Sequence, residues 1–204
     1  MYRLYDFLPS GNGYKIRLLL TQLKIPFERI EIDILQQESR TPEFLAKNPN
    51  GRVPVLELPS GQFLGESNAI LFYLSQDSPY FSEDFLEAAQ IMQWLFFEQY
   101  SHEPYIATSR FWMSCLGKPE EYREQLEQKQ APGYAALKVM ETHLSTHPFF
   151  VADRYTIADI GLFAYTHVAH EGGFDLAGFP AVQAWLERVR SQPDHISIQQ
   201  ETNP

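Results

Sequence analysis

The chain has 204 residues, 44% of them hydrophobic and 14% aromatic, which is typical of a globular protein with a substantial core. Its formal net charge of −10 argues against nucleic acid as a partner, because phosphates need a basic surface. No apolar run approaches the roughly 18–20 residues of a membrane span, and the early acid Asp6 is not typical of a signal peptide. We therefore expect no membrane partner. The single cysteine, Cys115, is compatible with a reducing cytoplasm, and the six scattered histidines show no metal-ligand spacing, so we expect no metal.

The N-terminal part of the sequence alternates between strand and helix patterns. Residues 2–7 and 27–33 carry β-forming residues with a period of two, which predicts two strands. Four apolar residues between these strands recur at helical spacing: Ile16, Leu19, Leu20 and Leu23. They predict a helix with one apolar face that ends before Pro26. Residues 41–45 then predict a short helix with proline at its first position.

A hairpin and a third helix follow. The Asn-Pro-Asn-Gly sequence at 48–51 predicts a turn. Residues 54–58 and 62–64 are short runs on either side of a Pro-Ser-Gly turn, and a proline is tolerated at the first residue of a strand. The apolar run 69–74 comes after Glu-Ser-Asn at 66–68, polar residues of the kind that cap a helix start. The predicted order is therefore β-α-β-α-β-β-α.

The remaining sequence is helical in pattern after a linker at residues 76–81. Residues 85–100 form a broad apolar surface, and a later stripe is interrupted at Pro132, where we expect a kink or a restart. Pro180 opens a last helix with four apolar residues on one side: Val182, Trp185, Leu186 and Val189. Thr156-Ile157-Ala158-Asp159 has the spacing of a capping box, and we interpret Asp159 as structural.

The pair Val53-Pro54 together with Glu66-Ser67 resembles the glutathione-binding half of the cytosolic glutathione transferases. The resemblance extends from the first strand to the Thr156–Asp159 element and so covers nearly the whole chain. It implies a thioredoxin-like α/β domain over residues 1–77, a linker at 78–84, and an all-helical domain over 85–204 that contributes the electrophile site. The class stays open between the serine-type, theta- or zeta-like enzymes and the bacterial beta-like enzymes.

The same resemblance implies how glutathione is held. A cis peptide bond before Pro54 would expose the backbone of Val53 to the cysteinyl part of glutathione, while Glu66 and Ser67 hold the γ-glutamyl end. These residue types suit the task, because a helix N-terminus stabilises a carboxylate and a glutamate pairs with an ammonium group. Arg40 and Arg52 are candidates for the glycine carboxylate, since guanidinium binds carboxylates in a bidentate manner; each is equally compatible with a solvated surface charge.

Catalysis would require glutathione to be bound as a thiolate. A free thiol has a pKa of about 8.5, and lowering it by two units takes about 2.7 kcal/mol of preferential thiolate stabilisation. One hydrogen bond to a charged group supplies about 1.5–3 kcal/mol, so one donor suffices and no general base is needed. Phe7 stands where tyrosine-type classes carry their donor. The candidate donors to the thiolate are, in order, Ser10, Asn12 and the backbone N–H groups of Gly11–Gly13. In the alternative interpretation, Ser10 only shapes a turn and Asn12 caps the helix.

The activity that the resemblance implies is conjugation of glutathione to small hydrophobic electrophiles in detoxification, by a homodimer. The electrophile site should lie between the domains and includes six candidates: Leu8, Tyr100, His102, Tyr105, Arg110 and Phe111. One rival function is another glutathione-dependent enzyme on the same fold, such as a peroxidase, isomerase or dehalogenase; the absence of cysteine from Ser10–Gly13 argues against disulfide exchange by the protein itself. The other is a non-enzymatic interaction protein, against which the intact Val53-Pro54 and Glu66-Ser67 pairs argue.

Overall fold

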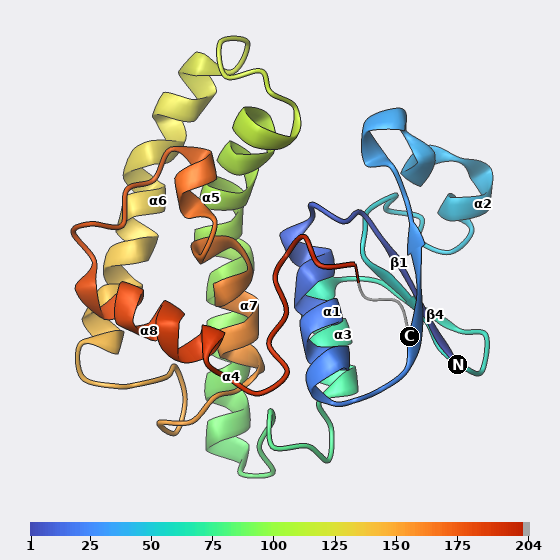
Figure 1. The fold of residues 1–204 in the computed structure, drawn as a ribbon, viewed down its shortest axis with the longest axis horizontal. Coiled ribbons are helices and arrows are strands. Elements are labelled where there is room, and N and C mark those ends of the chain that lie inside the picture. Colours follow the sequence, from blue (N-terminus) through green and yellow to red (C-terminus); the bar gives the residue numbers. More distant parts are fainter. Residues whose placement is uncertain (202–204) are drawn as a thin grey trace. The chain divides into compact units, whose positions relative to one another are not determined.

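Four strands form a single mixed sheet in the computed structural model, which describes residues 1–201 (Figure 1). The strands are β1 (Tyr2–Asp6), β2 (Phe27–Glu31), β3 (Val55–Glu57) and β4 (Phe63–Leu64), in the order β2-β1-β3-β4. β1 pairs in parallel with β2 and antiparallel with β3, and β3 pairs antiparallel with β4. The parallel pair requires a crossover connection, which a helix provides. The predicted hairpin is confirmed.

Within residues 1–78 the α-helices are α1 (Gly11–Gln22), α2 (Pro42–Leu45) and α3 (Ser67–Leu74), and two 3₁₀-helices, Ile34–Gln36 and Glu38–Arg40, precede α2. The side chain of Thr41 caps the short helix α2 by accepting from Phe44 N, and proline occupies its first position as predicted. α1 and α3 pack against each other. The predicted thioredoxin-like order β-α-β-α-β-β-α is thereby confirmed.

Helix α1 is buried on all sides, whereas the sequence predicted one apolar face. Every residue from Gly13 to Leu20 is buried, and these include the charged residues Lys15 and Arg17. One reason is the C-terminal tail, which packs on α1: the Tyr14 hydroxyl donates to Ile196 O at 2.8 Å, while Lys15 is bonded to Ser67 of α3. The predicted apolar residue Leu23 lies beyond the end of the helix, at its C-cap.

The chain divides into two compact units, and the tail crosses the division. The first unit is 1–78 together with residues 193–201 of the tail, and the second is 79–192. The sequence placed 85–204 in one helical domain, but residues 193–201 contact the first unit, because side chains of α1 bind their carbonyl groups. Residues 202–204 of that predicted domain lie outside the described part of the chain.

The second unit is helical. Its α-helices are α4 (Phe85–Phe97), α5 (Glu103–Arg110), α6 (Arg123–Leu144), α7 (Ile157–Thr166) and α8 (Pro180–Arg190). A π-helical turn, Glu98–His102, joins α4 to α5, and a second one, Phe111–Cys115, follows α5. α6 runs through Pro132 as a single helix, so the restart considered from the sequence does not occur. All ten residues of α7 are buried, which makes it the centre of this unit, and α4, α5 and α8 pack around it. Together with the thioredoxin-like unit, this confirms the predicted fold class.

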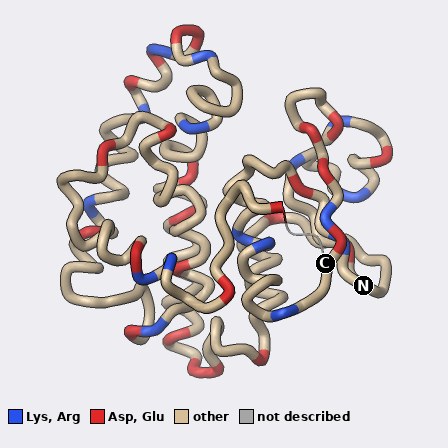
Figure 2. The backbone as a smooth tube through the Cα atoms, in the orientation of Figure 1, with Lys and Arg blue, Asp and Glu red and all other residues tan. Residues whose placement is uncertain are grey.

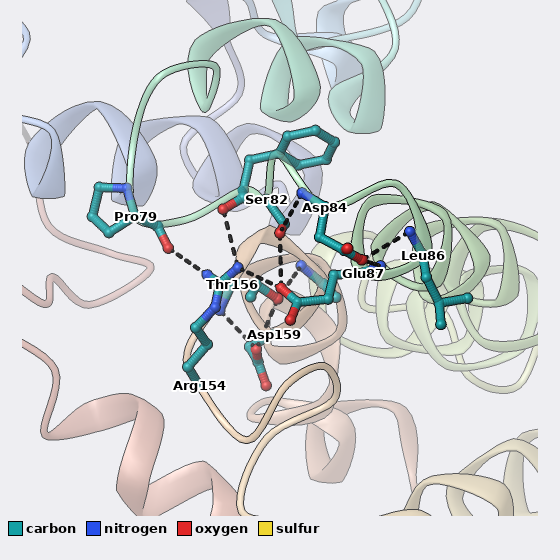
Figure 3. A network of polar contacts seen from close by, with 10 residues as sticks. Pro79, Ser82, Asp84, Leu86, Glu87, Arg154, Thr156 and Asp159 are labelled. Atoms are coloured by element: carbon teal, nitrogen blue, oxygen red, sulfur yellow. Dashed lines mark hydrogen bonds and ion pairs between the residues drawn. The ribbon is translucent and has the colours of Figure 1, made fainter.

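The start of α7 carries the predicted capping box (Figure 3). Asp159 accepts from Thr156 N at 2.9 Å and from the buried indole of Trp185 at 2.9 Å. Arg154, two residues before the cap, donates to Pro79 O and Phe81 O and pairs with Glu87 (Figure 3). These contacts tie the first residues of the second unit to α7.

Acidic and basic residues are interspersed along both units, as Figure 2 shows. Over residues 1–201, no helix is both long enough and apolar enough to cross a membrane.

Candidate functional site

The bond between Val53 and Pro54 is cis, as the resemblance implied. The loop before it is held by Asn48, whose Nδ2 donates to Arg52 O at 2.8 Å and whose Oδ1 accepts from Asn50 N at 3.1 Å. This local pattern follows from the sequence, since an asparagine side chain readily bonds to the backbone two residues on. The loop thus presents the backbone of Val53 at the start of β3.

Glu66 and Ser67 lie together at the start of α3, but in different environments. Glu66 is exposed and adopts a φ of 63°, a left-handed value that is uncommon for a residue with a side chain. Such a conformation costs on the order of 1–3 kcal/mol and tends to occur at functional sites. Its carboxylate accepts from Asn50 Nδ2 at 3.5 Å. Ser67 is buried and is the first residue of the helix.

The start of α1 brings both predicted thiolate donors close to this point. Ser10, rather than Asn12, is the N-cap of α1: its Oγ accepts from Gly13 N at 3.3 Å. Asn12 instead accepts through Oδ1 from the Ser67 hydroxyl at 3.3 Å. One hydrogen bond therefore joins the predicted thiol end of the site to the predicted γ-glutamyl end.

Lys15 is a site residue that the sequence reasoning missed. It is fully buried, and its Nζ donates to the Ser67 hydroxyl at 3.3 Å. A signal was available, since a lysine directly between Tyr14 and Ile16 of a helix needs a polar partner for its charge if it is buried. The partner was not predictable, because Ser67 lies 52 residues further along the chain.

A buried ion pair between Arg17 and Asp6 lies next to the first turn of α1. Arg17 Nε donates to Asp6 Oδ2 at 2.9 Å, and neither side chain is exposed. Burial raises the pKa of Asp6 to about 7, against the opposing influence of Arg17, and burial lowers the pKa of Arg17. Arg17 also donates to Leu8 O at 2.8 Å and to Ile198 O at 2.9 Å, so it fixes the loop that leads to Ser10 and binds the tail. The sequence reasoning identified none of these contacts.

The two candidate arginines are both exposed. Arg40 lies against the turn at Gly51, where its Nη1 donates to Asn50 O at 3.0 Å. Gly51 has a φ of 62° and a Cβ there would collide with the Arg40 guanidinium, so the turn requires glycine. Arg52 directly precedes Val53, and its carbonyl accepts from Asn48.

The candidate electrophile residues are placed differently from one another. Leu8 belongs to the first unit and the other five to the second. The Nε2 of the buried His102 lies 2.9 Å from the Thr166 hydroxyl, and the Arg110 Nε donates to Glu171 at 2.7 Å. The remaining three are accessible to different degrees: Tyr100 is exposed, and Tyr105 and Phe111 are half-buried. Within residues 1–201, no three His, Cys, Asp or Glu side chains are grouped so that they could hold a metal ion.

Comparisons with known proteins identify the family. Residues 1–76 match the family model of the glutathione S-transferase N-terminal domain, and residues 95–193 match that of the C-terminal domain. The crystal structure of a glutathione S-transferase from Pseudomonas fluorescens is 51% identical, covers 98% of this chain and 99% of its own, and has a TM-score of 0.95.

Two further relatives carry names other than glutathione S-transferase. The disulfide-bond oxidoreductase YfcG of Escherichia coli is 30% identical, over 92% of this chain and 89% of its own. A structure of Ure2p in complex with glutathione is 25% identical, covers 95% of each chain and has a TM-score of 0.85. Since the two family models together match most of the sequence, the chain belongs to the glutathione S-transferase family.

Proposed function

We propose that the protein binds glutathione and transfers its thiolate to small hydrophobic electrophiles. The observation that carries this proposal is the hydrogen bond between Asn12 and Ser67, which links a thiolate-activating turn to a γ-glutamyl site within one unit. The complex of the related Ure2p with glutathione supports the choice of ligand. In this proposal the backbone of Val53 pairs with the cysteinyl part of glutathione, and Glu66 and Ser67 bind the γ-glutamyl end.

In this proposal, Arg40 or Arg52 binds the glycine carboxylate of glutathione. Both side chains are exposed and thus available to a ligand. Arg40 already uses one nitrogen on Asn50 O, which holds the guanidinium near the loop before the cis bond. A guanidinium retains four further N–H donors in that arrangement, enough for a bidentate carboxylate contact.

Ser10 is the first choice for thiolate activation. As the N-cap it accepts from Gly13 N, and a hydroxyl that accepts a bond still has its own proton to donate to sulfur. The N-terminus of α1 adds about 0.3–1 kcal/mol of stabilisation for a negative charge. Together these terms reach the roughly 2.7 kcal/mol that a shift of two units in the thiol pKa needs. Asn12 and the backbone N–H groups of Gly11–Gly13 are the other donors at this turn.

Tyr100, Tyr105 and Phe111 of the helical unit are the residues we propose for contact with the electrophile. They supply the apolar surface that a hydrophobic substrate needs. We assign His102 and Arg110 a different task, because the buried His102 is bonded to Thr166 and Arg110 is paired with Glu171. Those contacts stabilise the helical unit.

A second candidate function is the reduction of disulfides by glutathione, and the name of the E. coli relative favours it. The turn Ser10–Gly13 contains no cysteine, so both thiols come from glutathione. The first glutathione thiolate attacks the substrate disulfide and releases one thiol as a mixed disulfide forms. The second attacks that mixed disulfide, so that the products are two substrate thiols and glutathione disulfide.

We further propose that the protein is a homodimer. Each unit carries large apolar side chains on its surface. On α4, Phe85 is 93% and Phe96 is 66% exposed, and on α3, Phe72 and Tyr73 are each exposed. Exposed aromatic residues repeated along one helix favour an interface, because isolated soluble chains rarely leave such surface in water.

The proposal is tested by binding and turnover. Calorimetry with glutathione comes first; without heat of binding in the wild type, the enzymatic proposal fails. Turnover is then measured with aryl halides, isothiocyanates, epoxides and hydroperoxides, and with a small disulfide to decide between the two functions. Ser10→Ala removes the hydroxyl and the cap together, while Ser10→Gly removes the hydroxyl but costs only a few tenths of a kcal/mol in capping.

We expect both Ser10 variants to lose about tenfold or more in kcat/KM with an unchanged fold, which is at least about 1.4 kcal/mol of transition-state stabilisation. Ser60→Ala, an exposed serine in the hairpin turn of the same unit, is the matched control and should behave as the wild type. If both Ser10 variants stay within about threefold of the wild type, the donor is Asn12 or the backbone.

A further inference from the structure

Lys15 is the third member of a polar chain that runs beneath the proposed glutathione site. Its Nζ donates to Ser67 Oγ at 3.3 Å, and Ser67 Oγ in turn donates to Asn12 Oδ1 at 3.3 Å. Lys15 and Asn12 lie on α1, three residues apart, and so face the same side of the helix, toward the start of α3. Lys15 is fully buried and Ser67 nearly so.

The hydrogen bonds of this chain run in one direction, from Lys15 through Ser67 to Asn12. A lysine ammonium donates and cannot accept, so Ser67 must offer it a lone pair. The single proton of the Ser67 hydroxyl is then directed to Asn12, whose carbonyl oxygen accepts it. The carboxamide of Asn12 is thereby oriented with Oδ1 toward Ser67 and its NH₂ group at the opposite end. A charged donor makes a hydrogen bond about twice as strong as a neutral one, which makes Lys15 the anchor of the chain.

We propose that Lys15 is a positioning residue that fixes the orientation of the Ser67 hydroxyl and the Asn12 amide, and so lowers the thiol pKa of bound glutathione. The inference rests on the proposed binding of glutathione at this site. Ser67 meets the γ-glutamyl end and Asn12 is a donor at the thiol end, so a single buried cation orders both ends.

The variant that tests this is Lys15→Met, which keeps an unbranched side chain that is one atom shorter and removes the charge and the donor. The thiol pKa of bound glutathione is read from the ultraviolet absorbance of the thiolate as a function of pH, with the protein in excess. We expect that pKa to rise by about one unit in Lys15→Met and the Kd for glutathione to increase about tenfold, the loss expected for one charge-assisted hydrogen bond. A role in folding alone would leave the thiol pKa unchanged.

Two further variants make the test specific. Lys24→Met is the matched control: the same chemical change at an exposed lysine of the same unit should leave both quantities as in the wild type. In Ser67→Ala the thiol pKa should rise as it does in Lys15→Met, and the double variant should show no additional rise, since residues in one network are non-additive.

If Lys15→Met does not fold, as judged by circular dichroism, Lys15→Gln decides. Glutamine is neutral like methionine but retains a donor, and we expect a smaller rise of the thiol pKa in the same direction. An unchanged thiol pKa in a folded Lys15 variant overturns the inference. Absence of glutathione binding by the wild type would instead refute the proposed function, so the two failures are distinguishable.

Discussion

Replacing Gly13 with alanine probes the support beneath the first turn of α1. A Cβ at this position would overlap the nearer carboxylate oxygen of Asp6 and lie 2.8 Å from the other. That carboxylate is fully buried and paired with Arg17 at 2.9 Å. It therefore has to move by about 2 Å to reach an ordinary van der Waals separation, which breaks its bond to Arg17.

Two effects of the substitution oppose each other. Alanine has a higher helix propensity than glycine by about 1 kcal/mol, which would stabilise α1. Separating a buried ion pair costs about 3–5 kcal/mol, because the charges are left without compensation in a site that excludes water. The steric effect is the larger, and we expect Gly13→Ala to lower the free energy of unfolding by about 2–4 kcal/mol. For a chain of this length each kcal/mol corresponds to about 2–4 °C in Tm.

The assay is urea unfolding followed by circular dichroism, with Gly178→Ala as the matched control. Among residues 1–201, no heavy atom outside Gly178 and its two chain neighbours lies within 4 Å of the place where a Cβ of residue 178 would stand, so the same chemical change there should stay within about 0.5 kcal/mol of the wild type. Combining Gly13→Ala with Asp6→Ala should cost no more than Asp6→Ala alone, since the carboxylate that obstructs the methyl group is gone. A Gly13→Ala protein as stable as the wild type would refute the reasoning.

Two further predictions concern the helical unit. Burial raises the pKa of Asp159 to about 6, above its unfolded value, so the folded protein keeps a proton that the unfolded chain releases. The contribution of Asp159 to the free energy of unfolding is complete below about pH 4 and is lost as the pH rises through 6. Asp159→Asn should remove this pH dependence in urea titrations between pH 4 and 7. Parallel plots of the free energy of unfolding against pH for the wild type and the variant would contradict the prediction. If α4 forms the homodimer interface, sedimentation should give a dimer for the wild type and a monomer for Phe96→Glu. Val139→Glu, an exposed apolar residue on α6, is the control, and a dimeric Phe96→Glu would place the interface elsewhere.

The parts of the fold that were predictable from the sequence depend on neighbours along the chain. Thr156 and Asp159 form a capping box because residues three apart meet at a helix start, and this spacing is visible in the sequence. The hairpin formed by β3 and β4 is local in the same sense. The buried side of α8 followed directly from the spacing of its apolar residues, all four of which are buried.

The contacts that escaped prediction join residues far apart in sequence. Arg17 binds Asp6 and Ile198, which lie 11 and 181 residues away, and no periodic pattern reports such pairs. The same holds for Lys15 and Ser67. The burial of α1 on all sides was missed for this reason: the face that looked polar is covered by a tail whose own sequence carries no strong pattern. The proposed site was therefore predictable as a set of motifs, but not as a network.

The two buried cations of α1, Lys15 and Arg17, bind different neighbours of its first turn. The free energy needed to bury their charges suggests that they have a role besides stability. Burying a charged side chain is expensive, and a well-packed apolar residue is often at least as stable in its place. The bonds of Arg17 to the Asp6 carboxylate, the Leu8 carbonyl and the tail offset the free energy of burying its charge. They also fix the loop before Ser10. Lys15 is bonded to the hydroxyl that holds Asn12. Stability alone does not require this arrangement. The proposed function does, since there the turn has to aim a donor at a thiolate, and a donor misplaced by even about 1 Å loses much of its effect.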